Sequence, residues 1–264
     1  MEKRIAYKGQ EIFYRTHGKG DPVVLIHGFA EDATIFSNQV SFLETKYFLI
    51  VPDLPGSGQS DFNESINSIE GYAEAILAVL DAEKILKATV IGHSMGGYIT
   101  LAIAENFPDR LETFGLFHSS AYADDDEKKK ARTKSIDFIN EHGAAKFLEE
   151  SIPKLFGEKF RKQNGEIIKE LVKQYAGFDA RALVQYTKAM MQRPDRTAVL
   201  KSWKKPILMI IGEEDSAIPF QVSLQQSHLP TMCYIHVAKE TGHMGMIEES
   251  TSCNEVILEF LDNE

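Results

Sequence analysis

The sequence has 264 residues, of which 43% are hydrophobic and 26% are charged; this ordinary globular mixture allows one large or two modest domains and argues against long disordered stretches. The formal net charge of −10 at pH 7 repels phosphate backbones and anionic lipids, so neither nucleic acid nor a membrane is expected as a partner. No apolar run has the length of a signal peptide or a membrane span, and the lone Cys233 and Cys253 are not in a metal-ligand spacing, so we expect a reduced protein in the cytoplasm.

Short apolar runs alternate with helical patterns in the first half of the chain. Two runs around Gly9 predict an opening hairpin, and residues 22–27, 47–53 and 87–93 predict buried strands because they are apolar nearly throughout. Residues 67–84 predict a helix, with Asn67 and Glu70 in the spacing of a capping box. This alternation is typical of a mostly parallel sheet with helices on both faces.

The second half contains a long helical interruption. Residues 111–122 predict the sixth strand, residues 123–199 are mainly charged helix formers, and strands resume at 206–215 and 232–240 before a final helix over 245–264. We therefore expect an α/β fold with a core formed by residues 1–122 and 200–264. The insertion, residues 123–199, is expected to lie as a lid over the strand ends, where ligands bind in open α/β sheets.

A run of charges begins this insertion. The acids of residues 124–127 precede the lysines of residues 128–130. Acidic residues in a first turn and basic residues behind them suit the helix dipole, so we interpret the run as a helix start rather than a docking patch.

Residues 90–100, VIGHSMGGYIT, place a serine between a buried strand and a helix. Gly92, Ser94 and Gly96 spell GxSxG, and in this context the pattern predicts a nucleophile elbow, whose strained turn projects the serine hydroxyl clear of the sheet. The backbone N–H of Met95, at the helix start, is then a candidate donor to a tetrahedral oxyanion. The loop after an earlier strand predicts a second donor, the N–H of Phe29, while His27 is interpreted as a structural loop residue.

A serine nucleophile needs a base, and a histidine base needs a carboxylate. His243 lies after the last strand and directly before the final helix, from where it can reach the strand ends. Asp215 ends another strand at the same edge of the sheet. Glu213 and Glu214 stand beside it, and Asp124 is the alternative acid. The other histidines are expected to be surface or packing residues: His17, His118, His142, His228 and His236.

Five motifs in order give the chain a resemblance to the α/β-hydrolase superfamily over nearly its whole length. They are HGF after the third strand, DLPGSGQS after the fourth, GHSMGG at the elbow, GEEDSAIP after the insertion, and GH before the last helix. In the second motif, Asp53, Gly56, Gly58 and Ser60 match a turn that shapes the rim of the site. The resemblance implies a catalytic triad of Ser94, Asp215 and His243, an oxyanion hole at Met95 and Phe29, and a helical cap above the pocket.

The resemblance also bounds the chemistry. It implies a serine hydrolase that cleaves small or medium carboxylic esters through an acyl-enzyme, with a small-molecule acyl substrate and no metal or organic cofactor. Thioesterases, lactonases, C–C bond hydrolases and small-molecule sensors that retain the triad remain alternatives. His93, where C–C bond hydrolases often have Asn, favours ester chemistry, and Ser94 disfavours the branches that use an aspartate nucleophile.

The pocket walls are expected among apolar side chains of the insertion. Some of them should roof an apolar cavity that favours an uncharged acyl group. Whether the chain forms a homodimer through the insertion is left open. The candidate pocket residues are Tyr122, Phe147, Phe156, Tyr175, Met190 and Met191.

Overall fold

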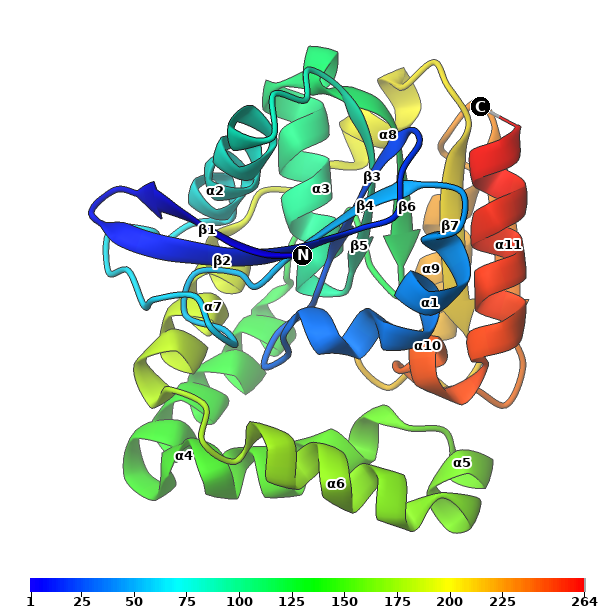
Figure 1. Cartoon of the computed structure of the whole chain (residues 1–264). Helices are drawn as coiled ribbons and strands as arrows, with labels where there is room; N and C mark the ends of the chain where they lie inside the picture. Colours follow the sequence, from blue (N-terminus) through cyan, green and yellow to red (C-terminus); the bar gives the residue numbers. More distant parts are fainter. Residues whose placement is uncertain (264) are drawn as a thin grey trace.

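The computed structural model describes residues 1–263, and its centre is one eight-stranded sheet (Figure 1). The strand order is β1-β2-β4-β3-β5-β6-β7-β8. β1 and β2 form the expected hairpin, β2 pairs antiparallel with β4, and the remaining pairs are parallel. The strands are β1 (Glu2–Tyr7), β2 (Gln10–His17), β3 (Pro22–Ile26), β4 (Phe48–Pro52), β5 (Ala88–His93), β6 (Leu111–Phe117), β7 (Ile207–Gly212) and β8 (Cys233–Ala238).

Helices cover both faces of the sheet, which confirms the predicted α/β architecture. In Figure 1, α2, α3 and α8 lie on one side of the sheet and α1 and α11 on the other. β5 and β7 are buried at every position, as expected for central parallel strands. The helices are α1 (Ser37–Leu43), α2 (Ile69–Ala82), α3 (Met95–Asn106), α4 (Asp126–Ser151), α5 (Glu158–Gln163), α6 (Gly165–Tyr175), α7 (Ala180–Gln192), α8 (Thr197–Ser202), α9 (Phe220–Ser227), α10 (Gly245–Glu248) and α11 (Ser250–Asp262).

The insertion after the sixth strand is helical. We call α4 to α7 (residues 126–192) the helical layer; its α4, α5 and α6 lie below the sheet in Figure 1. α4 is interrupted at Gly143, where φ is 83° and ψ is 166°. The boundary expected at residue 199 falls inside α8, whose Val199 and Leu200 pack in the same apolar cluster as α2 and α3.

Two local expectations differ from the structure. The N-cap of α2 is Ser68, whose hydroxyl accepts a hydrogen bond from the N–H of Gly71, rather than Asn67. Glu70, the expected partner in a capping box, instead pairs with Arg196. The final helix is divided at Glu249 into α10 and α11, and its expected last residue, Glu264, lies outside the described residues.

None of the helices within residues 1–263 has both the length and the apolar character needed to cross a membrane.

Candidate active site

Ser94 occupies a strained turn between β5 and α3. Its φ of 50° and ψ of −114° are unfavourable for a residue with a side chain, and such strain concentrates at functional sites. Its N–H donates to the carbonyl of Phe117 at 2.9 Å, which holds the turn against β6. A Cβ on Gly96 would collide with the carbonyl of Ile26 on β3, so glycine permits this close approach.

The side chain of Ser94 is half-buried and lines a cavity of about 370 Å³ between the sheet edge and the helical layer. His243 and Phe29 line the same cavity. Two larger hollows, of about 400 and 540 Å³, contain none of the candidate catalytic residues. The cavity is lined by Phe29, Glu31, Ser94, Tyr98, Lys128, Ala131, Arg132, Ser135, Leu155, Met190, Ser216, Ala217, Ile218 and His243.

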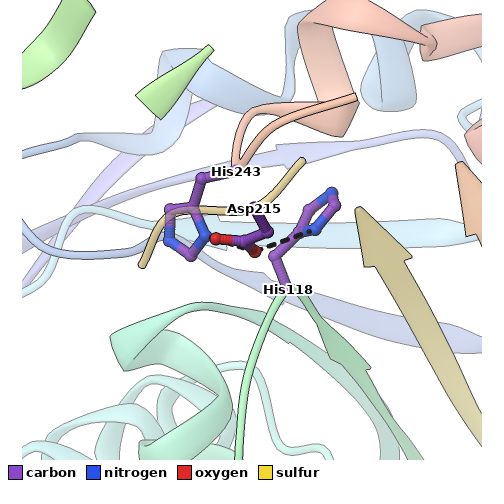
Figure 2. Close-up of side chains that lie close together, drawn as sticks. All are labelled: His118, Asp215 and His243. Carbon is purple, nitrogen blue, oxygen red and sulfur yellow. Dashed lines mark hydrogen bonds and ion pairs between the residues drawn. The ribbon is translucent and has the colours of Figure 1, made fainter. Parts of the chain in front are cut away.

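Asp215 and His243 are joined by a hydrogen bond from loops that follow β7 and β8 (Figure 2). The imidazole Nδ1 of His243 lies 2.8 Å from Oδ2 of Asp215. The other carboxylate oxygen, Oδ1, accepts hydrogen bonds of 2.8 Å from the N–H groups of Ala217 and Ile218. Of the candidate acids, Asp215 therefore contacts the candidate base, and its carboxylate fixes which imidazole nitrogen carries the proton.

The charges of this pair shift both pKa values. Burial alone would raise the pKa of Asp215, but the charge of His243 and the hydrogen bonds of His118 and His243 hold it well below its ordinary value. Burial alone would lower the pKa of His243, but the charge and the hydrogen bond of Asp215 outweigh burial and raise that pKa. The pair thus favours an imidazolium next to a carboxylate, as a general base requires after it accepts a proton.

His118, expected to be a surface or packing residue, lies fully buried on the other side of Asp215 (Figure 2). Its Nδ1 is 3.4 Å from Oδ2 of Asp215. Burial lowers the pKa of His118 to about 4, so this imidazole is neutral at pH 7. His118, Asp215 and His243 are the one group within residues 1–263 whose side chains could together ligate a metal; the shared carboxylate oxygen already accepts the hydrogen bond of His243.

Met95 directly follows Ser94, and Phe29 lines the same cavity as Ser94, so their backbone N–H groups remain the candidate oxyanion donors. Met95 is the first residue of α3, and Phe29 follows β3 in a loop where Ala30 has a φ of 61°. Within residues 1–263, neither N–H donates a hydrogen bond to another group. Because the first N–H groups of a helix have no acceptor inside the helix, that of Met95 is available to a ligand.

A buried Glu31–His93 pair, which the sequence analysis did not identify, supports this loop. Glu31 accepts the N–H of Gly28 at 2.7 Å and lies 2.9 Å from Nδ1 of His93. The Nε2 of His93 is 3.0 Å from the carbonyl of His243. Burial alone would raise the pKa of Glu31, but the charge and hydrogen bond of His93, together with the N–H of Gly28 and the charge of His27, lower that pKa. The residue before the serine therefore connects the Phe29 loop to the His243 loop.

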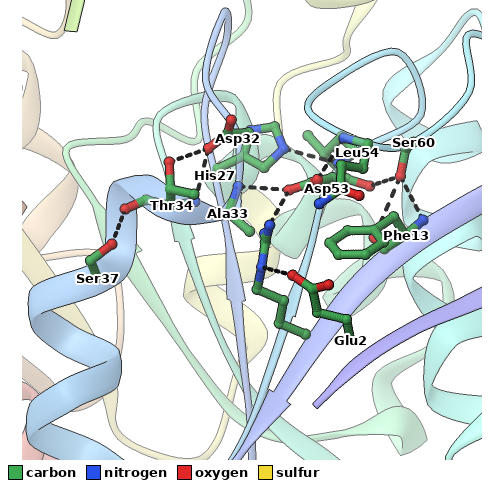
Figure 3. A network of polar contacts seen from close by, with 12 residues as sticks. Glu2, Phe13, His27, Asp32, Ala33, Thr34, Ser37, Asp53, Leu54 and Ser60 are labelled. Atoms are coloured by element: carbon green, nitrogen blue, oxygen red, sulfur yellow. Dashed lines mark hydrogen bonds and ion pairs between the residues drawn. The ribbon is translucent and has the colours of Figure 1, made fainter. Parts of the chain in front are cut away.

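The DLPGSGQS turn forms a polar network next to the site (Figure 3). Asp53 accepts the N–H groups of Ala33 and Gln59 at 2.9 and 2.8 Å. Ser60 donates to the carbonyl of Asp53 at 2.7 Å, and Nε2 of His27 accepts the N–H of Leu54 at 2.9 Å. These contacts agree with a structural role for both the turn and His27.

The six candidate pocket residues separate into three groups. Met190 lines the cavity of Ser94. Phe147 and Tyr175 line a neighbouring apolar cavity of about 200 Å³ that shares Phe29, Glu31 and Leu155 with the first. The third group, Tyr122, Phe156 and Met191, is absent from the described lining of both cavities. Phe156 instead stacks on Phe160 at a ring-centroid distance of 5.2 Å.

Asp124, the alternative acid, binds two arginines rather than a histidine. Its carboxylate lies 2.5 Å from Nε of Arg132 and 2.8 Å from Nη1 of Arg193. Asp125 accepts the N–H of Lys128 and caps α4, and Asp126 and Glu127 lie in its first turn, as the helix-start interpretation predicts. Lys128 and Arg132 were not expected at the site but line its cavity.

Comparison with known proteins extends these observations. Residues 21–116 match the family model described as the alpha/beta hydrolase fold. An uncharacterized hydrolase of Bacillus subtilis is 25% identical over 281 residues, which cover 98% of this chain and 97% of that protein. The 3-oxoadipate enol-lactonase 2 of Acinetobacter baylyi is 25% identical over 204 residues, covering 76% of this chain and 75% of the lactonase.

One solved structure is similar to this chain over its whole length. The thermophilic esterase from Thermogutta terrifontis, with malate bound, superposes with a TM-score of 0.93 and 26% identity, over 100% of this chain and 98% of the esterase. The family match over residues 21–116, the full-length match to the Bacillus subtilis hydrolase and this structural match agree with one another. The chain is therefore a hydrolase-fold protein that belongs to the α/β-hydrolase superfamily.

Proposed function

We propose that the chain is a serine esterase that cleaves small or medium carboxylic esters through an acyl-enzyme intermediate. The observation that carries the proposal is one cavity lined by both Ser94, on its strained turn, and His243, which is hydrogen-bonded to Asp215. A nucleophile, a base and an acid that orients the base are the three parts that acyl transfer needs.

In the acylation step, Nε2 of His243 accepts the hydroxyl proton as Oγ of Ser94 attacks the ester carbonyl. The carbonyl oxygen becomes an oxyanion, which the N–H groups of Met95 and Phe29 stabilise. His243 then donates the proton to the leaving alkoxide, so that the alcohol departs and the acyl group remains on Ser94. Asp215 keeps the imidazole oriented throughout and stabilises its charged form.

In the deacylation step, the same groups act on water. His243 accepts a proton from a water molecule that attacks the acyl carbonyl, and the same two N–H groups stabilise the second oxyanion. His243 then returns a proton to Oγ of Ser94, which releases the carboxylic acid. The helical layer acts as a cap, because Met190, Arg132 and other side chains of α4 and α7 line the cavity above Ser94 and limit the access of bulk water.

Lactone hydrolysis is the second candidate, because the enol-lactonase of Acinetobacter baylyi is 25% identical over 76% of this chain. A lactone is a cyclic ester, so the same serine, base and oxyanion donors would open it. The two candidates differ in the leaving alcohol, which stays attached to the acyl group when a lactone opens.

The test is hydrolysis of p-nitrophenyl esters from acetate to octanoate, followed through many turnovers, with simple lactones in parallel. We expect Ser94→Ala to lower kcat by about a millionfold, because the triad acts as a unit. Ser227→Ala, on remote α9, is the matched control and should retain wild-type turnover.

Equal turnover by the wild type and Ser94→Ala would rule out the proposed nucleophile. A single burst without further turnover would contradict the esterase and would favour a sensor that retains the triad. Sustained opening of lactones without hydrolysis of open-chain esters would favour the second candidate.

A further inference from the structure

One face of α4 turns toward the candidate active site. Lys128, Ala131, Arg132 and Ser135 all line the cavity of Ser94, and their spacing of i, i+3, i+4 and i+7 places them along one stripe of the helix. Two of the four are cations and a third is a hydroxyl. The α4 side of the cavity therefore carries polar and positively charged side chains, whereas the sequence analysis expected an uncharged acyl group.

Nearby carboxylates balance only part of the positive charge of this wall. Asp124 is buried between Arg132 and Arg193, within 2.5 and 2.8 Å of the two guanidinium groups, so this trio carries one net positive charge. Lys128 is half-buried, and its Nζ donates to the neutral carbonyl of Ala217 at 3.2 Å. Among the described residues, no carboxylate forms an ion pair with Lys128.

Glu31, the remaining acidic residue of the cavity, already has hydrogen-bond partners. Glu31 accepts the N–H of Gly28 and pairs with Nδ1 of His93. It forms no ion pair with Lys128 or Arg132, and its charge acts on His243. A concentrated positive wall is unusual in a chain whose formal net charge is −10. A partly buried cation without a carboxylate partner, as Lys128 is among the described residues, is stabilised by an anionic ligand.

We infer that Lys128 and Arg132 form a subsite for a carboxylate of the substrate, so that the natural ester carries a second, anionic end. The inference rests on the proposed function, because it places that carboxylate in the cavity whose other wall holds Ser94. Arg132 uses Nε for Asp124, and its planar guanidinium suits a planar carboxylate. Ser135 lines the same wall, but its hydroxyl donates to the carbonyl of Ala131 at 3.2 Å, so the two cations carry the proposed recognition.

The size of the cavity also suits a small substrate with a carboxylate at one end. A volume of about 370 Å³ is near the lower end of small-molecule sites. A hemi-ester of a short dicarboxylic acid would place its ester carbonyl at Ser94 and its free carboxylate toward α4. The neighbouring apolar cavity of about 200 Å³ is then available to the alcohol part.

The experiment compares two esters that differ in one group. Monomethyl glutarate and methyl pentanoate have the same chain and leaving alcohol, but the first ends in a carboxylate and the second in a methyl group. Methanol release gives kcat/KM for each ester with the wild type, Lys128→Met and Lys130→Met. Lys130 is exposed on the same helix, which makes its variant the matched control.

We expect the wild type and Lys130→Met to prefer the hemi-ester by about tenfold or more, the usual worth of one charge-assisted hydrogen bond. Lys128→Met should bring the ratio of the two kcat/KM values towards one, because it loses more activity on the hemi-ester than on methyl pentanoate. Equal use of the two esters by the wild type would overturn the inference, as would an equal loss on both esters in Lys128→Met.

A binding measurement separates failure of the subsite from failure of the proposed function. Glutarate and its uncharged diamide are titrated calorimetrically into the wild type and Lys128→Met without any ester present. Glutarate that binds the wild type about tenfold more tightly than it binds Lys128→Met supports the subsite even if neither ester is hydrolysed. Glutarate that binds no better than the diamide overturns it, whatever the outcome for the esterase.

Discussion

At the scale of single residues, the chemistry of the site depends on the charge around His243. Asp215 raises the pKa of this imidazole against the effect of burial, and the charge of Glu31 raises it further. The positive charge of Lys128 acts in the opposite direction and lowers it. Lys128 thus has two separable effects, one on the base and one on an anionic substrate.

This balance predicts the acid limb of the pH profile. In the proposed mechanism His243 must be neutral to accept the proton of Ser94, so we expect kcat/KM to rise as the pH passes the pKa of His243, which lies above the ordinary value of 6.5. Lys128→Met removes a positive neighbour and should move the acid limb to higher pH. The profile is measured with methyl pentanoate, which avoids binding at the proposed subsite. An unchanged or lower midpoint, relative to Lys130→Met, would contradict this assignment.

The residues that the sequence identified differ in kind from those it missed. Ser94 lies in the contiguous motif GxSxG, and Asp215 and His243 each follow a strand at the same sheet edge, so local pattern was sufficient to nominate them. Glu31 pairs with His93, 62 positions later, and His118 pairs with Asp215, 97 positions later (215 − 118). Their roles depend on packing between distant segments, which a single sequence does not display.

At the scale of elements, strands and helices were predictable where one physical signal dominated. Fully apolar runs became the buried central strands, and glycines marked the elbow. Helix boundaries were less certain because neighbouring residues compete for the same role. At the start of α2, both Asn67 and Ser68 are good N-cap residues, but only Ser68 is the one whose side chain bonds the helix. Its Ile69 neighbour is fully buried, which fixes the rotation of the first turn.

The cap of α2 gives a stability prediction. Ser68→Ala leaves the N–H of Gly71 without its side-chain acceptor, so the free energy of unfolding should fall by about 1 kcal/mol. Asn67→Ala, at the neighbouring exposed position, should change it by less than about 0.5 kcal/mol. Urea denaturation followed by circular dichroism measures both. A larger loss for Asn67→Ala than for Ser68→Ala would restore the capping box predicted from the sequence.

The face of α4 toward the cavity shows the same limit. The spacing of Lys128, Arg132 and Ser135 places them on one stripe of a helix. The charged residues around them, however, predict a helix that is exposed to solvent on every side. The hydrophobic signal is weak because only Ile139, Ala144 and Leu148 of this helix are buried. Which stripe faces the site is decided by how the helical layer rests on the core, and that arrangement is a tertiary property.

At the scale of the whole molecule, the helical layer is tied to the core by polar contacts around the active-site cavity. Tyr186 of α7 is fully buried, and its hydroxyl lies 2.8 Å from the carbonyl of Pro55 and 2.7 Å from Oγ of Ser57. Both partners belong to the DLPGSGQS turn. Arg196, just after the helical layer, pairs with Glu70 on α2 and Glu105 on α3. The position of Met190 over the cavity depends on these ties, because it lies on the same helix as Tyr186.

Removing one tie should therefore affect both stability and the site. Tyr186→Phe keeps the aromatic ring against Phe29 and Tyr72 but leaves the carbonyl of Pro55 and the hydroxyl of Ser57 without this partner. We expect the free energy of unfolding to fall by about 1–2 kcal/mol and KM for short esters to rise as the layer loosens over the cavity. Tyr234→Phe is the control, because the hydroxyl of Tyr234 has no hydrogen bond within residues 1–263. Denaturant unfolding measures the change in stability, and steady-state kinetics measures KM. A loss of stability with an unchanged KM would mean that apolar packing alone holds α7 in place over Ser94.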